Sequence, residues 1–271
     1  MQRRSFLQLL TLGGSSLVFP GYCAGNSTGE DESIKDYLYR MSHPDNAYEG
    51  DITASSPEKP LLSGLTDRLG RVQSVVGHGH FNVLSFDNML RFGRRYSAIG
   101  AFNKAETDFL EKLFYQDAVR YGFHGEKPLS QLTESIDRKA IVKLPYTGQY
   151  LFKGAPLELY RKIRRDVGDT ITLTSGVRGV VKQMHLFLRK ASRNQGNLSL
   201  ASRSLAPPGY SFHGTGDFDV GRIGLGARNF SEAFAKTEEF RKLIDLGYID
   251  IRYPLANNLG VRFEPWHIKI T

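Results

Sequence analysis

Apolar residues recur at helical spacing in the first half of the chain, between residues 61 and 122. The clearest case opens at Asn103, which is followed three residues later by Glu106 in the pattern of a helix-capping box. Apolar side chains then share one helical face, at Phe109, Leu110, Leu113, Phe114 and Ala118. Two more helices are predicted near residues 66–75 and 85–96. This part of the chain is therefore predicted to form a helical subdomain.

From about residue 128 the pattern changes to short strands and helices. The β-branched run at residues 170–174 predicts a strand. Ser175 and Gly176 then lead into a predicted helix that carries Arg178 in its first turn. The side chains that this helix is expected to bury are Val177, Val180, Val181, Met184 and Leu188.

A second capping-box pattern, Asn229 with Glu232, predicts a helix that ends near Gly247. Residues 248–253 and 260–270 have the pattern of two strands, and the Asn-Asn-Leu-Gly turn between them indicates a hairpin. Together these elements predict an α+β fold, in which a small antiparallel sheet with flanking helices follows the helical N-terminal subdomain.

Residues 26–60 contain few apolar residues and many Ser, Asp, Glu, Pro and Gly. Such composition predicts an extended arm, here with one short helix near residues 33–41. We therefore expect three segments: a targeting segment at residues 1–25, the arm and helical subdomain at residues 26–127, and an α+β domain at residues 128–271.

The composition is that of a globular protein with its own core, since the 271 residues are 40% hydrophobic and 24% charged. The formal net charge of +8 favours anionic partners such as nucleic acid, phospholipid or an acidic polymer. The basic residues are scattered and form no nucleic-acid recognition motif, so no nucleic-acid partner is predicted.

Arg3 and Arg4 open a short N-terminal segment whose apolar stretch, residues 6–19, is interrupted by Gly and Ser. About 20 apolar residues are needed to span a bilayer, so no stable membrane span is expected. An arginine pair followed by Phe6 and Leu7 is typical of a twin-arginine export signal, and a chance pair is the alternative. We therefore expect a periplasmic location.

Cys23 is the single cysteine of the sequence. It excludes an intrachain disulfide and a cysteine-based zinc site, so any metal must be held by His and carboxylate side chains. Lipid attachment at Cys23 is less expected, because small residues normally precede a lipidated cysteine and Tyr22 stands here. Signal cleavage is expected near Ala24 or Gly25.

Two histidines and an acid supply the chemistry of a metal site. His213 and Asp219 lie on either side of a glycine turn, and His267 lies near the C-terminus. Two imidazoles with one carboxylate are typical of catalytic zinc sites that keep one position open for water. Glu264 provides a base beside them.

A second histidine pair, His78 and His80, lies in the predicted helical subdomain. Both side chains can point the same way if the segment is a strand or a turn, as a metal pair requires. No third ligand accompanies them in the sequence, so an ordinary loop is the preferred interpretation.

Three sequence blocks in this order resemble the VanY-like zinc D,D-carboxypeptidases. The blocks are Thr174-Ser175-Gly176-Val177-Arg178 with Gln183, Ser211-x-His213-x-x-Gly216-x-x-Asp219, and Glu264-Pro265-Trp266-His267. The family belongs to the fold group of the lysostaphin-type peptidases and the hedgehog signalling domain. The resemblance covers residues 128–271 and implies that they form a catalytic domain, while residues 26–127 lie outside it.

The middle block is one residue shorter than the family pattern, Ser-x-His-x-x-Gly-x-Ala-x-Asp. That pattern places the metal Asp seven residues after the His, where this chain has Val220. Asp217 and Asp219 both stand nearby and would project to the same face of a strand, so strand alternation does not separate them. The Asp-hydrophobic pair that closes the motif favours Asp219, and Asp217 is the alternative.

The resemblance implies a zinc ion held by three ligands, His213, Asp219 and His267. It also implies two catalytic groups, with Glu264 as the general base for water and Arg178 as the cation that stabilises the oxyanion. Weaker candidates for holding the terminal peptide or carboxylate of the substrate are Ser175, Gln183 and Ser211.

The substrate that the resemblance implies is the D-Ala-D-Ala end of a peptidoglycan stem peptide. L,D-carboxypeptidase or endopeptidase activity on the same polymer is the nearest alternative, because pocket shape decides which bond enters the site. A non-catalytic wall-binding module that keeps zinc is a further alternative. The presence of both Glu264 and Arg178 argues against that module.

Overall fold

The computed structural model describes residues 28–270. The chain divides into two compact units, one ending at Tyr37 and the other beginning at Leu38. Helix α1 (Thr28–Ser42) contains the short helix predicted near residues 33–41 and crosses this division. The expected signal at residues 1–25, with Cys23, lies outside the described residues. No helix in the described part is both long enough and apolar enough to cross a membrane.

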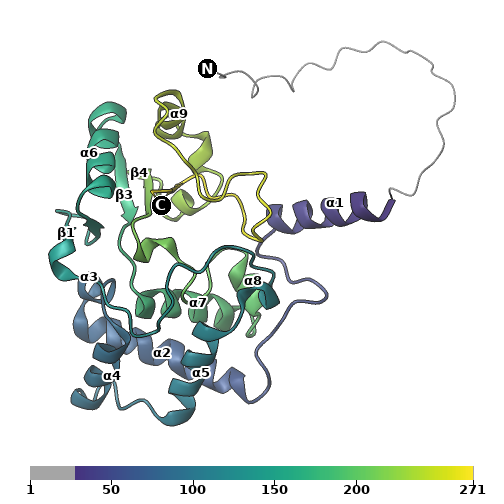
Figure 1. Ribbon diagram of the computed structural model, residues 1–271, viewed down its shortest axis with the longest axis vertical. Coiled ribbons are helices and arrows are strands. Elements are labelled where there is room, and N and C mark those ends of the chain that lie inside the picture. The colour runs from purple at the N-terminus through teal and green to yellow at the C-terminus, as the bar shows by residue number, and fades with distance from the viewer. Residues whose placement is uncertain (1–27, 271) are drawn as a thin grey trace. The chain divides into compact units, whose positions relative to one another are not determined.

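Helices from the first half of the chain pack on a helix from the second half. Helix α2 lies against α7, and α4 and α5 pack beside α2 (Figure 1). The bounds of these helices are Glu58–Val76 for α2, His78–Phe81 for α3, Phe86–Arg95 for α4, Lys104–Tyr115 for α5, Val180–Arg193 for α7 and Leu198–Ser202 for α8. Short 3₁₀ helices η1 (Ala118–Tyr121) and η2 (Arg138–Ala140) follow α5.

The core between these helices contains residues from both sides of the predicted domain boundary. Leu65 and Leu69 of α2 are fully buried together with Phe187 and Leu188 of α7 in one cluster. The apolar face of α2 and that of α7 cover each other, so burial of this surface stabilises both segments together. The boundary near residue 127 stays a prediction.

The helix start predicted at Asn103 is confirmed. The Asn103 side chain accepts a hydrogen bond from the backbone N–H of Glu106, and the Glu106 carboxylate accepts one from the N–H of Asn103, both at 2.9 Å. Helix α4 likewise begins after Ser85, whose hydroxyl accepts from the backbone N–H of Asn88. Local sequence determined both starts, since a cap needs only residues three apart.

Two small antiparallel sheets complete the α+β fold, as the sequence predicted. One pairs β1 (Ile141–Lys143) with β2 (Tyr150–Phe152), and the other has the order β3-β4-β5. The strands of the second sheet are β3 (Ile171–Ser175), β4 (Phe218–Arg222) and β5 (His267–Ile268). Helices α6 (Ala155–Val167) and α9 (Glu238–Asp245) cover it, and Ile163, Phe218 and Trp266 lie in the core between them.

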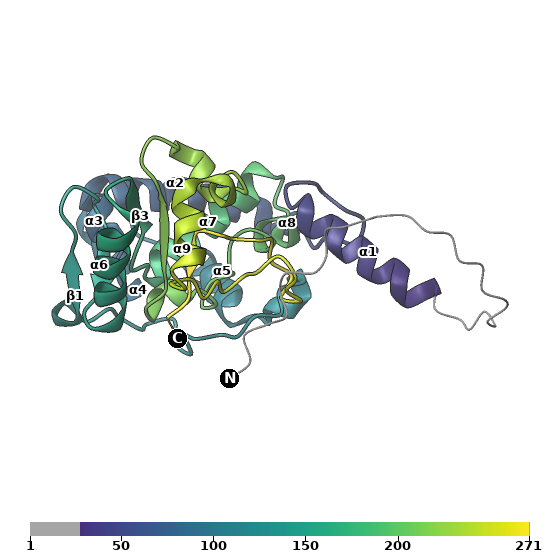
Figure 2. The same cartoon turned by 90° about the horizontal axis from the view of Figure 1, so that it is seen from above.

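The predicted hairpin near the C-terminus is wrong. Residues 248–266 form an irregular segment, drawn in yellow in Figures 1 and 2, with one isolated bridge between Ile251 and Ile268. Strand β5 pairs instead with β4, which is distant in sequence. Pro254 and Pro265 contribute to this outcome, because a proline has no backbone N–H to donate to a strand partner.

The helix predicted from Asn229 to Gly247 is also wrong in its first half. Two 3₁₀ turns, η4 (Gly226–Phe230) and η5 (Phe234–Lys236), precede α9, whose N-cap is Thr237. The Asn229 side chain does not cap a helix. It instead exchanges hydrogen bonds of 2.8 and 3.0 Å with the backbone of Arg222 in β4.

Arg178 does not lie in the first turn of a helix, as the sequence had predicted. Helix α7 begins at Val180 after the N-cap Gly179. The backbone N–H of Val177 donates to the carbonyl of Tyr150 at 2.7 Å, and the N–H of Arg178 donates to the carbonyl of His213 at 3.1 Å. These long-range bonds hold the segment before α7 extended and place Arg178 next to His213.

Candidate metal centre

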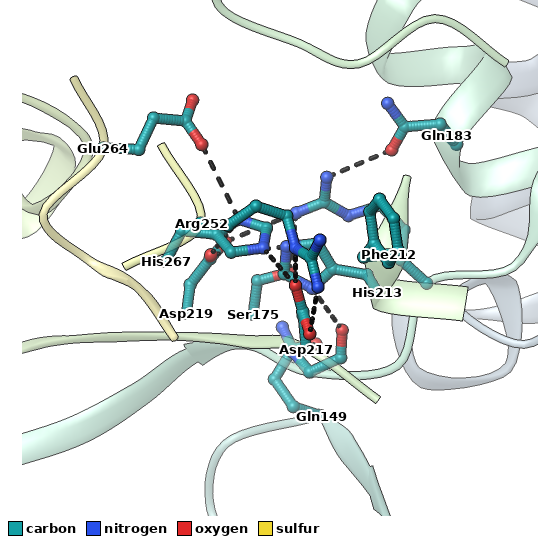
Figure 3. A network of polar contacts seen from close by, with 12 residues as sticks. Gln149, Ser175, Gln183, Phe212, His213, Asp217, Asp219, Arg252, Glu264 and His267 are labelled. Carbon is teal, nitrogen blue, oxygen red and sulfur yellow. Dashed lines mark hydrogen bonds and ion pairs between the residues drawn. The ribbon is translucent and has the colours of Figure 1, made fainter. Parts of the chain in front are cut away.

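Three buried side chains from separate elements converge at the end of the β3-β4-β5 sheet (Figure 3). They are His213 in the 3₁₀ helix η3 (Phe212–Gly214), Asp219 in β4 and His267 in β5, and they offer one ligand atom each, all within 4.8 Å of one another. Asp219 and His267 are cross-strand partners in the β4–β5 ladder. Strand register therefore brings together residues that lie far apart in sequence.

The distances between these atoms suit a metal ion. The Oδ1 atom of Asp219 lies 3.3 Å from Nε2 of His213 and 3.4 Å from Nδ1 of His267. A zinc ion with tetrahedral ligands at about 2 Å separates its ligand atoms by about 3.3 Å. Among the described residues Asp219 Oδ1 has no hydrogen-bond partner, although it is buried. A buried acceptor without a donor is costly, and a cation would satisfy it.

The second nitrogen of each imidazole is held by the protein. Nδ1 of His213 lies 2.9 Å from the carbonyl oxygen of Gly176, and Nε2 of His267 lies 3.0 Å from Oδ2 of Asp217. When these nitrogens donate, the lone pairs of the other two nitrogens face Asp219. The residues present therefore fit a zinc ion held by two imidazoles and one carboxylate.

We expect Gly176→Ala to destabilise the protein and the metal site together. A Cβ atom at this position would lie 1.9 Å from the carbonyl oxygen of Tyr150, so the loop that carries the Gly176 carbonyl must shift. Overpacking of this kind typically lowers the free energy of unfolding by about 1–3 kcal/mol. Chemical denaturation of both proteins in the presence of zinc measures the loss.

Gly70→Ala is the matched control, because nothing lies within 4 Å of a Cβ added at Gly70 inside α2. It should stabilise the protein by about 0.5–1 kcal/mol, the helix preference of Ala over Gly. Equal stability of the Gly176→Ala variant and the unsubstituted protein would contradict the role given to this close contact.

Asp217 lies on the opposite side of the His267 ring from Asp219. Its carboxylate accepts hydrogen bonds from the backbone N–H of Ile270 at 2.8 Å and from the guanidinium of Arg252, in addition to its contact with His267. Arg252 stacks over the ring of Phe212, with 3.4 Å between the guanidinium carbon and the ring centre. Burial raises the pKa of Asp217, but hydrogen bonds from His267 and Arg252 lower it to about 2. Asp217 is thus an ionised outer partner of His267.

The charges around the three side chains differ. Burial and then the nearby Arg178 lower the pKa of His213, which keeps its imidazole neutral and able to donate a lone pair. Burial also disfavours a charged His267, but hydrogen bonds to Asp217 and Glu264 raise its pKa to about 9. Burial raises the pKa of Asp219, yet His213 and other neighbours leave it below its usual value. Carboxylates therefore surround His267 and favour positive charge at this point.

The predicted catalytic side chains border the same three residues. One carboxylate oxygen of Glu264 lies 3.6 Å from Nδ1 of His267. Nη2 of Arg178 lies 3.4 Å from Oδ2 of Asp219 and donates to the hydroxyl of Ser175 at 2.9 Å. Burial lowers the pKa of Arg178, but the carboxylates of Asp219 and Glu264 oppose that shift, and a guanidinium stays charged in proteins.

A cavity of about 460 Å³ opens over this centre. Its wall includes Arg178 and Glu264 and two of the candidate substrate-binding residues, Ser175 and Ser211. Gln183 is different, because its side chain is 1% exposed, accepts from Nη1 of Arg178 at 3.1 Å and donates to the carbonyl of Ala206. In this structure Gln183 orients Arg178, and direct contact of Gln183 with substrate stays a prediction.

The histidine pair near residue 79 lies in the one-turn helix α3, which corrects the predicted loop. His78 lies within hydrogen-bonding distance of the Gln73 side chain and lines the cavity together with Asn82. The helical part of the chain therefore contributes His78 and Asn82 to the wall of the cavity.

Sequence reasoning missed Arg252 and Tyr253. Both fell in a predicted strand, where neither stands out from its neighbours. In the structure Arg252 holds Asp217, and the Tyr253 ring packs edge-on against the imidazole of His267 with 5.3 Å between centres. These contacts depend on the path of the irregular segment after α9, which no local pattern indicated.

Comparison with known proteins agrees with this geometry. Residues 155–270 match the family model described as VanY, D-alanyl-D-alanine carboxypeptidase. A search of curated proteins found no match. The matched segment contains His213, Asp219 and His267 together with Glu264 and Arg178. The resemblance to this family is confirmed for the segment, and the roles of these residues stay a prediction. Residues 155–270 of this chain are therefore similar to the VanY family, which is described as D-alanyl-D-alanine carboxypeptidase.

Proposed function

We propose that this protein is a zinc-dependent D,D-carboxypeptidase that hydrolyses the terminal D-Ala-D-Ala bond of peptidoglycan stem peptides. The observation that carries the proposal is the convergence of His213, Asp219 and His267 beside Glu264 and Arg178, within a VanY domain and at the wall of one cavity. A carboxypeptidase acting on peptidoglycan peptides is what the family supports, and the metal and the residue roles are our proposal.

The proposed zinc ligands are His213, Asp219 and His267. When bound there, zinc supplies a Lewis acid that lowers the pKa of a water molecule toward about 7. The Glu264 carboxylate, 3.6 Å from Nδ1 of His267, would accept a proton from the attacking water and later deliver it to the leaving amine. Asp217 keeps the His267 ring oriented through the contact at Nε2.

Arg178 stabilises the negative charge that develops on the scissile carbonyl oxygen. Its guanidinium is held from two sides, by Ser175 and by Gln183, so little reorganisation is needed during the reaction. Ser211 lies in the cavity wall, where its hydroxyl can bond the terminal peptide or carboxylate of the substrate.

The proposed site of action is the periplasm, after export by the twin-arginine pathway. Support comes from the arginine pair at residues 3 and 4 and from the net charge of +8, which favours retention at an anionic envelope. Release of a reporter fusion to the periplasm only when both arginines are present tests this location.

We expect chelation of zinc to abolish release of D-Ala from a stem pentapeptide, and added zinc to restore it. The reason is that removal of the metal leaves no Lewis acid at the three proposed ligands to activate the water. Measurement of D-Ala release before chelation, after it, and after reconstitution checks the prediction. Full activity in metal-free protein would rule out the zinc mechanism.

The same assay separates the alternative activities. Removal of D-Ala from a tetrapeptide would identify an L,D-carboxypeptidase, and cleavage of cross-linked dimers would identify an endopeptidase. Zinc-dependent binding of sacculi with no cleavage of any peptide would identify the non-catalytic module.

A further inference from the structure

The cavity over the metal centre extends along α7 to three cations that the proposed mechanism does not use. Lys182, Arg189 and Arg262 all lie in its wall, and so does Leu186. Lys182, Leu186 and Arg189 are four and three residues apart, so one face of the helix carries them. The cavity is therefore positively charged on the side that leads away from Arg178.

Lys182 and Arg189 have no carboxylate partner among residues 28–270. The half-buried Lys182 ammonium lies 5.6 Å from the centre of the Phe81 ring. Burial and then the positive charges of Arg178 and Arg189 lower the pKa of Lys182 to about 8. Burial and then the positive charge of Arg193 lower the pKa of the exposed Arg189. Such mutual repulsion disfavours the empty cavity, and a bound anion would relieve it.

Two polar groups elsewhere in the cavity wall lack hydrogen-bond partners among the residues that the structure describes. Arg262 donates from Nη2 to the carbonyl of Phe230 at 3.0 Å, while its buried Nε has no hydrogen-bond partner within the described chain. The hydroxyl of Ser204, also in this wall, is likewise buried without a partner there. The backbone N–H of Arg262 donates to the carbonyl of Arg203, which holds Arg262 close to Ser204.

We propose that Lys182, Arg189 and Arg262, with the hydroxyl of Ser204, form a second anion subsite that binds a carboxylate of the substrate on the acyl side of the scissile bond. This inference rests on the proposed carboxypeptidase function. The substrate class is then a peptide with an acidic residue upstream of its two terminal residues.

The acyl side follows from the position of the cations. A carboxypeptidase removes one terminal residue, so only the acyl side of its substrate extends far from the metal. Seven residues of helix between Lys182 and Arg189 rise by about 10 Å. An extended peptide covers this distance in about three residues. The subsite thus recognises a carboxylate on the acyl side, and the stretch between Lys182 and Arg189 is about as long as three residues of an extended peptide.

Binding to the zinc-loaded Glu264→Gln protein tests the subsite without turnover. Isothermal titration compares a stem pentapeptide that has free carboxylates upstream of its D-Ala-D-Ala end with the same peptide after amidation of those carboxylates. We expect amidation to raise Kd about tenfold, the loss of a charge-assisted contact. Equal Kd values for the two peptides, or no binding of the acidic one, would overturn the proposal.

The cations are tested in the same background. The double variant Lys182→Gln with Arg189→Gln should bring the ratio of the two Kd values close to one. Arg193→Gln is the matched control, because Arg193 is an exposed cation of α7 outside the cavity wall, and it should keep the ratio. Lys182→Arg should keep it too, which separates loss of charge from disturbed packing. An unchanged ratio in the double variant would overturn the proposal.

The two proposals fail in different ways. If the unsubstituted protein releases no D-Ala from either peptide, the carboxypeptidase function fails, whatever the ratio of the Kd values. If D-Ala is released from both peptides and they bind equally well, only the second subsite fails.

Discussion

Glu264→Gln is expected to lower kcat for D-Ala release by about 10²–10⁴-fold, the usual contribution of a general acid–base group. The amide keeps the shape of the side chain but cannot accept the proton of the attacking water. Zinc should stay bound, because Glu264 borders the three proposed ligands without being one of them. Steady-state kinetics with a stem pentapeptide and zinc analysis of the same sample measure both effects.

Glu238→Gln provides the control for this variant. Glu238 is an acid of α9 that pairs with Lys242 and lies outside the cavity wall. Its substitution should leave kcat unchanged. A Glu264→Gln protein with the kcat of the unsubstituted enzyme would remove Glu264 from the mechanism, whereas loss of zinc from that variant would make Glu264 a ligand.

Asp219→Ala is expected to remove zinc binding and activity together, while Asp217→Asn should weaken zinc binding by about 10- to 100-fold and leave residual activity. The difference arises because Asp219 Oδ1 faces a nitrogen of each histidine, whereas Asp217 contacts His267 through the outer nitrogen of its ring. Competition with a chromogenic chelator gives the zinc affinity of each variant. The opposite order of the two affinities would make Asp217 the ligand.

The position of helices α2 and α3 gives residues 58–81 a structural link to the proposed function. Helix α2 packs on α7, and α7 carries Lys182 and Arg189 on the side that lines the cavity. His78 and Asn82 contribute a further part of the wall. The segment outside the family match therefore supports the shape of the cavity in which the peptide is expected to bind.

Much of the candidate site could be predicted from the sequence, because its residues stand in short motifs. His213 with Asp219, and Glu264 with His267, stand at spacings that indicate a metal site before any coordinates are known. The capping box at Asn103 could be predicted in the same way, since its two hydrogen bonds join residues three apart. Each of these signals depends only on near neighbours in the chain.

Other features depended on contacts between distant segments. The asparagine at residue 229 has the same capping pattern as Asn103, yet it bonds the backbone of β4 and starts no helix. Gln183 matches a family position, but its side chain is hydrogen-bonded to the Arg178 guanidinium and to the carbonyl of Ala206. At Asn229 a hydrogen bond to β4 replaced the helix cap that the pattern predicted, and at Gln183 hydrogen bonds within the protein occupy a side chain for which substrate contact was predicted.

The sequence by itself determined the α+β class, the helix starts at Ser85 and Asn103, and the set of residues from which a metal site can be built. Only the tertiary structure decided that Asp219 lies between His213 and His267, that Asp217 lies behind His267, and that the C-terminal segment forms no hairpin. The physical reason is that helix caps and motif spacing act over a few residues. Strand pairing and burial, in contrast, depend on which distant segments satisfy each other's hydrogen bonds and cover each other's apolar faces.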